Sequence, residues 1–117
     1  MPKAKIKFLQ KPNCTTCRKA KAFLENRKVE LETRDLGKDR LSIAELDQLI
    51  GKRDHRKFLN TRNELYRSRK MGENPPSRDE ALRLMAAEPN LIRRPVVLRG
   101  SEIVLGYDEE ALAQISK

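Results

Sequence analysis

The sequence is short of aromatic residues, of cysteine and histidine, and of long apolar runs. Only 4% of its 117 residues are aromatic, and they do not alternate with basic residues, which argues against a surface that stacks single-stranded nucleobases. The longest uncharged apolar runs are short pieces such as Pro95–Leu98, so we expect no transmembrane helix and no membrane partner. The first residues lack the apolar core of about 7–15 residues that a signal peptide needs. We therefore expect a cytoplasmic protein.

Cysteine and histidine are too few for a structural metal site. The only cysteines are Cys14 and Cys17 and the only histidine is His55, whereas a zinc site needs about four ligands. We expect no metal. His55 lies in the charged run 52–57, where a solvated surface histidine is the simpler expectation. In a reducing compartment a cysteine pair is more often catalytic than structural, and the alternative of two inert core cysteines stays open.

Positive charge is in excess. The chain has 26 Lys and Arg against 17 Asp and Glu, a formal net charge of +9 at pH 7. Such a surface attracts anions or nucleic acid, or it simply keeps the protein soluble. Because aromatic residues are few, we expect no direct nucleic-acid binding and keep it only as a third hypothesis. The length suits one domain, residues 1–117, that folds without a disulfide or a metal.

Hydrophobic periodicity predicts a βαβ unit at the start of the chain. Apolar and charged residues alternate around Ile6 and Phe8, which predicts a strand over about 4–9 that ends at the segment 11–13, which contains Pro12. A helix is expected from Thr15 to about residue 27, because its apolar residues share one face. A second strand is expected over 29–33, where apolar and charged residues alternate again.

The middle of the chain predicts helices and the end returns to strands. The capping boxes that begin at Ser42 and Ser77 predict two helices, and 63–70 is a candidate for another between them. We place a helical insertion at about 42–88. Strands over 95–98 and 103–105 are expected around a turn, with a last helix capped by Asp108. The fold class is therefore α/β, in the order βαβ, helices, ββα, with a mixed sheet of about four strands.

The cysteine pair opens the first predicted helix. A thiolate at a helix N-terminus is stabilised by unpaired backbone N–H groups and by the positive end of the helix dipole. Cys14 occupies that place, so we expect it to be the attacking nucleophile. Cys17 lies one turn further on and could attack a mixed disulfide on Cys14 to release the product.

Most of the arginines are expected to be ordinary surface charge. Arg94 stands out because it directly precedes Pro95 at the start of a predicted buried strand. There its side chain could present a two-pronged hydrogen-bonding group to an oxyanion. Arg93 has the weaker claim.

Several motifs together resemble one known family across nearly the whole chain. They are the run 12–20 around the cysteine pair, Asn60-Thr61-Arg62, the run 91–97 that contains Arg93-Arg94-Pro95, and Leu105-Gly106-Tyr107. In this order they resemble the arsenate reductase (ArsC) and Spx family. The resemblance implies a thioredoxin-like fold with an all-helical insertion. It also implies that Pro95 is a cis proline that faces the redox cysteine.

The reductases of this family imply roles for five positions. There, a cysteine attacks arsenate, glutathione resolves the adduct, and three arginines hold the oxyanion. The resemblance makes Cys14 the nucleophile and Arg62 and Arg94 two of the arginines, while the third position falls at Tyr107 and the position of a family histidine falls near Gln10. It implies no bound cofactor, with glutathione or glutaredoxin as reductant.

The Spx branch of the family implies a different task. Spx proteins bind the C-terminal domain of the RNA polymerase α subunit and regulate transcription when their cysteine pair is oxidised. Cys17 favours this branch, and Gly51 lies near the place of the glycine on which the polymerase contact depends. Our first hypothesis is a thiol-dependent reductase, probed with arsenate, and the alternative is a regulator switched by a Cys14–Cys17 disulfide. We expect a monomer in either case.

Overall fold

The computed structural model describes residues 5–11 and 13–117, and the chain divides into two compact units. The first unit consists of the chain up to Asp39 together with Arg94–Lys117, and the second is Arg40–Arg93. The helical insertion expected at about 42–88 lies within the second unit. Pro12, and Ala4 of the strand predicted over 4–9, lie outside the described residues. In the part of the chain that is described, no helix is both long and apolar enough to cross a membrane.

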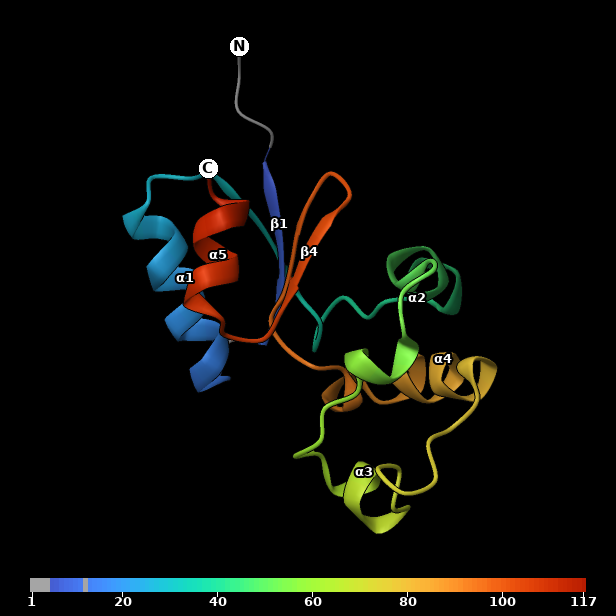
Figure 1. Ribbon diagram of the computed structural model, residues 1–117. Coiled ribbons are helices and arrows are strands. Elements are labelled where there is room, and N and C mark those ends of the chain that lie inside the picture. Colours follow the sequence, from blue (N-terminus) through green and yellow to red (C-terminus); the bar gives the residue numbers. More distant parts are fainter. Residues whose placement is uncertain (1–4, 12) are drawn as a thin grey trace. The chain divides into compact units, whose positions relative to one another are not determined.

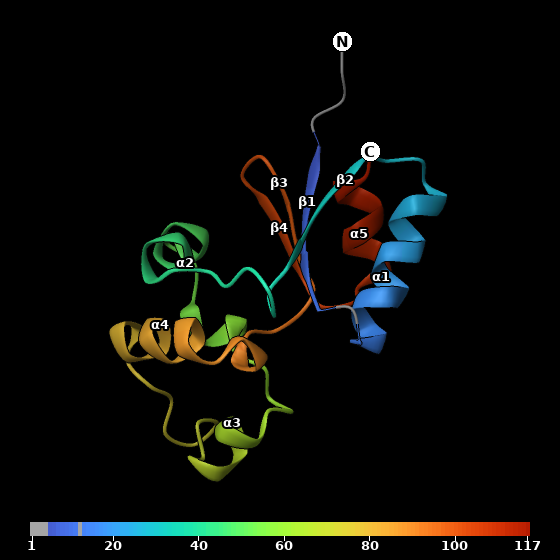
Figure 2. The ribbon, with the colours of Figure 1, turned by 180° about the vertical axis from the view of Figure 1, so that it is seen from behind.

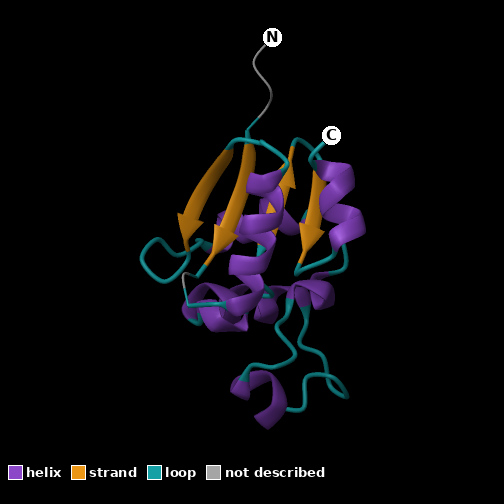
Figure 3. Cartoon of the chain, turned by 90° about the vertical axis from the view of Figure 1, so that its left-hand side faces the viewer, coloured by secondary structure: helices purple, strands orange, loops and turns teal. Residues whose placement is uncertain are grey.

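The first unit is a mixed sheet with two helices (Figures 1 and 2). Its elements are β1 (Ile6–Gln10), α1 (Thr15–Asn26), β2 (Leu31–Asp35), β3 (Val96–Arg99), β4 (Glu102–Leu105) and α5 (Glu109–Ile115). The strand order is β2-β1-β3-β4. β1 pairs parallel with β2 and antiparallel with β3, and β3 pairs antiparallel with β4. Figure 3 shows the four strands side by side. The predicted α/β class and mixed sheet are confirmed.

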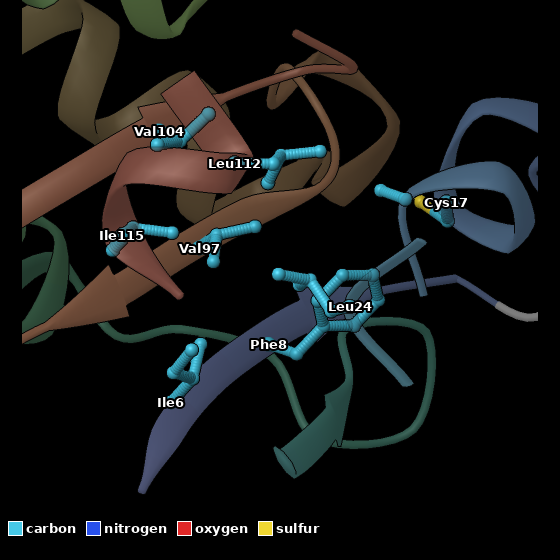
Figure 4. Close-up of a cluster of buried hydrophobic side chains, with 9 residues drawn as sticks. Ile6, Phe8, Cys17, Leu24, Val97, Val104, Leu112 and Ile115 are labelled. Carbon is cyan, nitrogen blue, oxygen red and sulfur yellow. The ribbon is translucent and has the colours of Figure 1, made fainter. Parts of the chain in front are cut away.

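Both helices of this unit lie on the same side of the sheet and bury its apolar face (Figures 1 and 2). Alternate residues of β1 point to one face, and among them Ile6 and Phe8 are fully buried. The apolar stripe of α1 and the inner residues of α5 cover them (Figure 4). The resulting core cluster consists of Ile6, Phe8, Cys17, Ala20, Leu24, Val97, Val104, Leu112 and Ile115. Cys17 is therefore built into the core.

Strand β2 begins later than the sequence pattern predicts. The alternation of charged and apolar residues indicates a strand over 29–33, whereas β2 spans Leu31–Asp35. After α1 the backbone turns through Lys28, whose φ of 60° lies in the left-handed region. The turn uses residues that periodicity alone assigns to the strand, so pairing with β1 starts with Ile6 opposite Leu31.

The second unit is helical. It contains α2 (Ile43–Ile50), the 3₁₀ helix η1 (His55–Phe58), α3 (Glu64–Ser68), α4 (Arg78–Ala87) and the 3₁₀ helix η2 (Pro89–Leu91). Its buried apolar residues include Leu46, Ile50, Phe58, Met85 and Leu91. The three predicted helices are present, although α3 is shorter than the expected 63–70 and has no buried residue. The 3₁₀ helices have no counterpart in the sequence prediction, because such short elements lack a clear period.

The start of α2 offers a test of local stability. Ser42 Oγ accepts the Glu45 N–H at 3.1 Å, and Glu45 Oε1 accepts the Ser42 N–H at 3.1 Å. Ser42→Ala removes this capping interaction, and we expect the free energy of unfolding, measured by urea denaturation, to fall by about 1 kcal/mol. Ser68→Ala is the matched control, because that hydroxyl donates only to a carbonyl of its own helix, Leu65 O. Equal losses in the two variants would contradict the capping role.

Candidate functional site

Cys14 is the N-cap of α1, and its sulfur is held by the start of that helix. Its backbone is extended, with φ −85° and ψ 116°. Its N–H donates to Lys11 O at 3.1 Å, and its Sγ accepts the Cys17 N–H at 3.3 Å. The first turn of α1 contains no acidic residue, so nothing on this turn opposes the positive end of the helix dipole. Cys14 is half-buried, so its sulfur can be reached from outside at the start of the helix.

Cys17 is in a different environment from Cys14, although both are free thiols. Its exposed fraction is 0%, because it belongs to the core cluster. Burial, and the hydrogen bond to the Cys14 side chain, raise the pKa of Cys17 from 9.0 to about 12. A backbone hydrogen bond from Lys11 and the charge of Arg94 act on this pKa in the opposite direction. At neutral pH Cys17 therefore stays protonated and can donate its hydrogen to the Cys14 sulfur.

Arg94 and Pro95 belong to the same unit as the cysteine pair. Arg94 is half-buried and Pro95 is buried. The peptide bond between them is cis, the conformation that the family resemblance implied. The positive charge of Arg94 lowers the pKa of Cys17, so the structure brings this arginine into electrostatic contact with the pair. Lys11 also contributes here, and its only signal in the sequence is its position directly after the first strand.

Tyr107 lies on the loop that follows β4. This loop is held beside Pro95, because the Gly106 N–H donates to Pro95 O at 2.9 Å. The Tyr107 ring packs edge-on against Phe23, with centroids 6.5 Å apart, and its hydroxyl donates to Glu109 Oε1 at 2.6 Å. Phe23 is nine residues after Cys14, or about 14 Å along a helix axis. The Tyr107 side chain is thus anchored to the C-terminal half of α1, and it supplies no positive charge to replace a third arginine.

Arg62 belongs to the second unit, where it precedes α3. Its side chain is exposed, and its backbone N–H donates to Asn60 Oδ1 at 3.1 Å. Its expected role at an oxyanion therefore remains a prediction. Arg93 is also exposed and in this unit.

His55 corrects an expectation from the sequence. It is half-buried rather than fully solvated, and its Nε2 lies 2.8 Å from Pro76 O. With Nε2 protonated, the ring donates this hydrogen bond and ties η1 to the chain before α4. The role is structural, and the charged run around His55 gave no sign of it because the partner is 21 residues away.

The described residues offer little for a metal ion. Within 5–11 and 13–117, no group of three or more His, Cys, Asp or Glu side chains is placed to hold one.

Comparison with known proteins shows the family of the chain. The model of the ArsC family matches residues 9–115. The chain belongs to the ArsC family. Among solved structures, the arsenate reductase from Vibrio cholerae superposes with a TM-score of 0.83 at 26% sequence identity, covering 97% of this chain and 99% of that one. The thioredoxin-like fold implied by the sequence is confirmed.

Relatives with different names are also similar in sequence. The global transcriptional regulator Spx from Lactiplantibacillus plantarum is 28% identical over 103 residues, which cover 86% of this chain and 78% of the regulator. The uncharacterized protein YusI from Bacillus subtilis is 35% identical over 109 residues, or 90% of this chain and 92% of YusI. The relatives thus include regulators as well as reductases, and family membership does not decide between these tasks.

The position of Cys17 in the core predicts how its ionisation depends on pH. In a Cys14→Ser variant burial remains, and burial is the largest cause of the raised pKa. Because the neutral thiol is favoured in the folded state, we expect its thiolate absorbance to appear only well above pH 9.0. Cys17 in the unfolded chain ionises near that ordinary value, so in the wild-type protein Cys17 favours folding below pH 9.0, and this contribution is lost as the pH rises toward about 12.

The measurement is a pH titration of ultraviolet absorbance, from which the curve of the double variant Cys14→Ser/Cys17→Ala is subtracted to remove the tyrosines. The same Cys14→Ser protein in denaturant is the control and should ionise near the ordinary value. A folded-state midpoint at or below the midpoint in denaturant would show that burial does not control this thiol.

Proposed function

We propose that this ArsC-family chain is a thiol-dependent reductase in which Cys14 attacks the oxidised substrate. The observation that carries the proposal is the division of roles between the two cysteines. Cys14 is half-buried at the N-terminus of α1 and accepts the Cys17 N–H at 3.3 Å, whereas Cys17 is buried and protonated. Only the Cys14 sulfur is both half-exposed and placed at the start of a helix with a backbone N–H directed at it, which is the position that a nucleophile requires.

With arsenate as the substrate, the proposed chemistry needs no bound cofactor. The Cys14 thiolate forms a bond to arsenic and an oxygen leaves as water after protonation. A glutathione thiolate then attacks the Cys14 sulfur, the sulfur–arsenic bond breaks, and its electron pair reduces As(V) to As(III), which leaves as arsenite. The resulting mixed disulfide on Cys14 is reduced by glutaredoxin or by a second glutathione. A reducing cytoplasm would supply these thiols.

Arg94 and Arg62 are proposed to hold the oxyanion. Arg94 already acts electrostatically on the cysteine pair, and Arg62 has an exposed guanidinium in the second unit. We expect Arg94→Gln and Arg62→Gln each to lower kcat/KM for arsenate by about 10²-fold, because each removes a charged donor from the developing anion. Arg83→Gln, an exposed arginine on α4, is the matched control and should leave kcat/KM unchanged. An Arg62 variant as active as this control would remove Arg62 from the site.

The first experiment is an arsenate reduction assay with glutathione, glutaredoxin and an NADPH-coupled reductase. We expect turnover by the wild-type protein that depends on Cys14. On the same samples, free thiols are counted before and after oxidation with diamide. Absence of turnover, together with loss of two thiols per chain, would overturn the proposal in favour of the alternative.

The alternative is a redox-switched regulator of the Spx type. The observation that favours it is Cys17 itself, whose N–H lies 3.3 Å from the Cys14 sulfur, close enough for a Cys14–Cys17 disulfide after a small rearrangement. In this case the disulfide is the output and the partner is the C-terminal domain of the RNA polymerase α subunit. A pull-down with that domain tests the alternative. Binding that changes between the diamide-treated and the dithiothreitol-treated protein supports it, and equal or absent binding contradicts it.

A further inference from the structure

The reduced cysteine pair places two sulfur atoms together at the start of one helix. The Cys17 thiol hydrogen-bonds to the Cys14 side chain, and the Cys14 sulfur in turn accepts the Cys17 backbone N–H at 3.3 Å. Both sulfurs are free. The two sulfurs are soft ligands in direct contact, so together they can supply two of the positions around a thiophilic centre.

The number and geometry of these two ligands do not suit most metal ions. Structural zinc takes four ligands, and among the described residues no third Cys, His, Asp or Glu joins the pair. A linear two-coordinate ion needs its sulfur ligands on opposite sides, whereas these two sulfurs are in hydrogen-bonding contact. A pyramidal centre with adjacent sulfur ligands fits better, because it takes two neighbouring sulfurs and leaves its third position to an outside group. Trivalent arsenic is thiophilic and has this geometry.

We propose that the reduced Cys14–Cys17 pair is a chelating site for trivalent arsenic. Arsenous acid and the two thiols form two sulfur–arsenic bonds and release two molecules of water, while the third position keeps a hydroxyl group or takes an outside thiol such as glutathione. Arsenic stays trivalent and both sulfurs stay at their oxidation level, so no oxidant or reductant is needed. Both thiol protons leave with the departing oxygens.

The surroundings of the pair decide in which form each sulfur meets the arsenic. Cys17 enters as the neutral thiol, because burial outweighs the Lys11 backbone and the charge of Arg94, and its proton leaves with an oxygen of arsenous acid. Access is one-sided, because Cys17 is fully buried and Cys14 is half-buried. The arsenic must therefore enter over Cys14, and its third substituent must point outward on that side. A small inorganic arsenite and phenylarsine oxide, whose phenyl group takes the outward position, both meet this requirement.

The site has a consequence that rests on the proposed function. If Cys14 reduces arsenate, the released arsenite can bind to the pair once the mixed disulfide on Cys14 has been reduced, and Cys17 becomes the residue that retains it. Cys17→Ala should then relieve inhibition by added arsenite. Binding itself does not depend on turnover, so the two ideas can be separated by experiment.

The test is a titration of the reduced full-length protein with arsenite and, separately, with phenylarsine oxide, followed by loss of titratable thiols and by calorimetry. We expect one arsenic per chain, loss of two thiols, and reversal by an excess of a small dithiol. Cys14→Ser and Cys17→Ala should each bind the arsenic compound at least about 10²-fold more weakly than the wild type, because the second sulfur no longer binds intramolecularly. Thr16→Ala, on the same helical turn, is the matched control and should bind like the wild type.

The other outcomes either contradict the chelate or separate it from the proposed function. Equal affinity of Cys17→Ala and the wild type would overturn the chelate, as would wild-type protein that retains both free thiols in the presence of phenylarsine oxide. A fold defect in Cys17→Ala is detected by circular dichroism, and in that case thiol loss by the wild type decides. Arsenate turnover without chelation would overturn only this inference. Chelation without turnover would support it and overturn the proposed function.

Discussion

Replacing Cys14 by serine should lower thiol-dependent turnover by about 10³-fold or more. The sulfur is the one soft, half-exposed nucleophile at the N-terminus of α1, and a serine hydroxyl there is neither ionised at neutral pH nor able to form the mixed disulfide that glutathione resolves. The effect should fall on kcat, because the step that is lost is chemical. The coupled arsenate assay with glutathione and glutaredoxin measures it.

Cys17→Ala is the matched control for this variant. In the proposed cycle an outside thiol resolves the adduct, and the protonated, buried Cys17 takes no obligatory part. The kcat of Cys17→Ala should remain within about tenfold of the wild-type value, because a side chain that takes no part in the chemical step contributes little to kcat. Loss of activity in Cys17→Ala as severe as in Cys14→Ser would mean that both cysteines are needed, and that the cycle runs through an internal disulfide.

Phe8→Ala should lower the free energy of unfolding by about 3–5 kcal/mol. Phe8 is fully buried in the central strand β1, where it is paired with Thr33 of β2 and Val97 of β3. Truncation leaves a cavity at the centre of the core cluster (Figure 4) that the surrounding sheet and helices can fill only in part. Because a domain is stable by only about 5–15 kcal/mol, this one change should remove much of the total, as measured by urea denaturation.

Two controls separate the cavity from an effect on the strand itself. Lys7→Ala changes the neighbouring residue of β1, whose side chain is exposed, and should change the free energy of unfolding by no more than about 0.5 kcal/mol. Phe8→Leu refills much of the space and should lower the free energy of unfolding clearly less than Phe8→Ala does. A loss in Lys7→Ala comparable to that in Phe8→Ala would show that β1 contributes through its backbone rather than through this side chain.

The sequence predicts those parts of the fold that are governed by local signals. Alternation around Ile6 and Phe8 indicates β1, and the capping serines Ser42 and Ser77 mark the starts of α2 and α4, which begin at the next residue in each case. The start of β2 is displaced because a left-handed turn at Lys28 has no strong marker in a lysine. The short 3₁₀ helices and the shortened α3 are decided by packing within the second unit, to which periodicity is blind.

The candidate site is predictable where its residues are close in the sequence. Cys14 and Cys17 share one helical turn, so their roles follow from the position of that turn after a strand. The direction of the Tyr107 side chain does not follow from its neighbours, because its partner Phe23 lies on another helix. The burial that separates the two cysteines chemically is also a tertiary property, since it depends on strands and a helix from both ends of the chain.

The absence of tryptophan gives the two tyrosines a practical use. Tyr107 belongs to the first unit and Tyr66 to the second, so each unit carries one intrinsic fluorophore and no brighter chromophore obscures it. The hydroxyl of Tyr107 donates to the Glu109 carboxylate, a contact that quenches tyrosine emission and is broken on unfolding. The emission of a Tyr66→Phe protein should therefore become brighter as the first unit unfolds, whereas a Tyr107→Phe protein emits from the second unit alone. Together the two variants would show by fluorescence whether the units melt in one transition or in two.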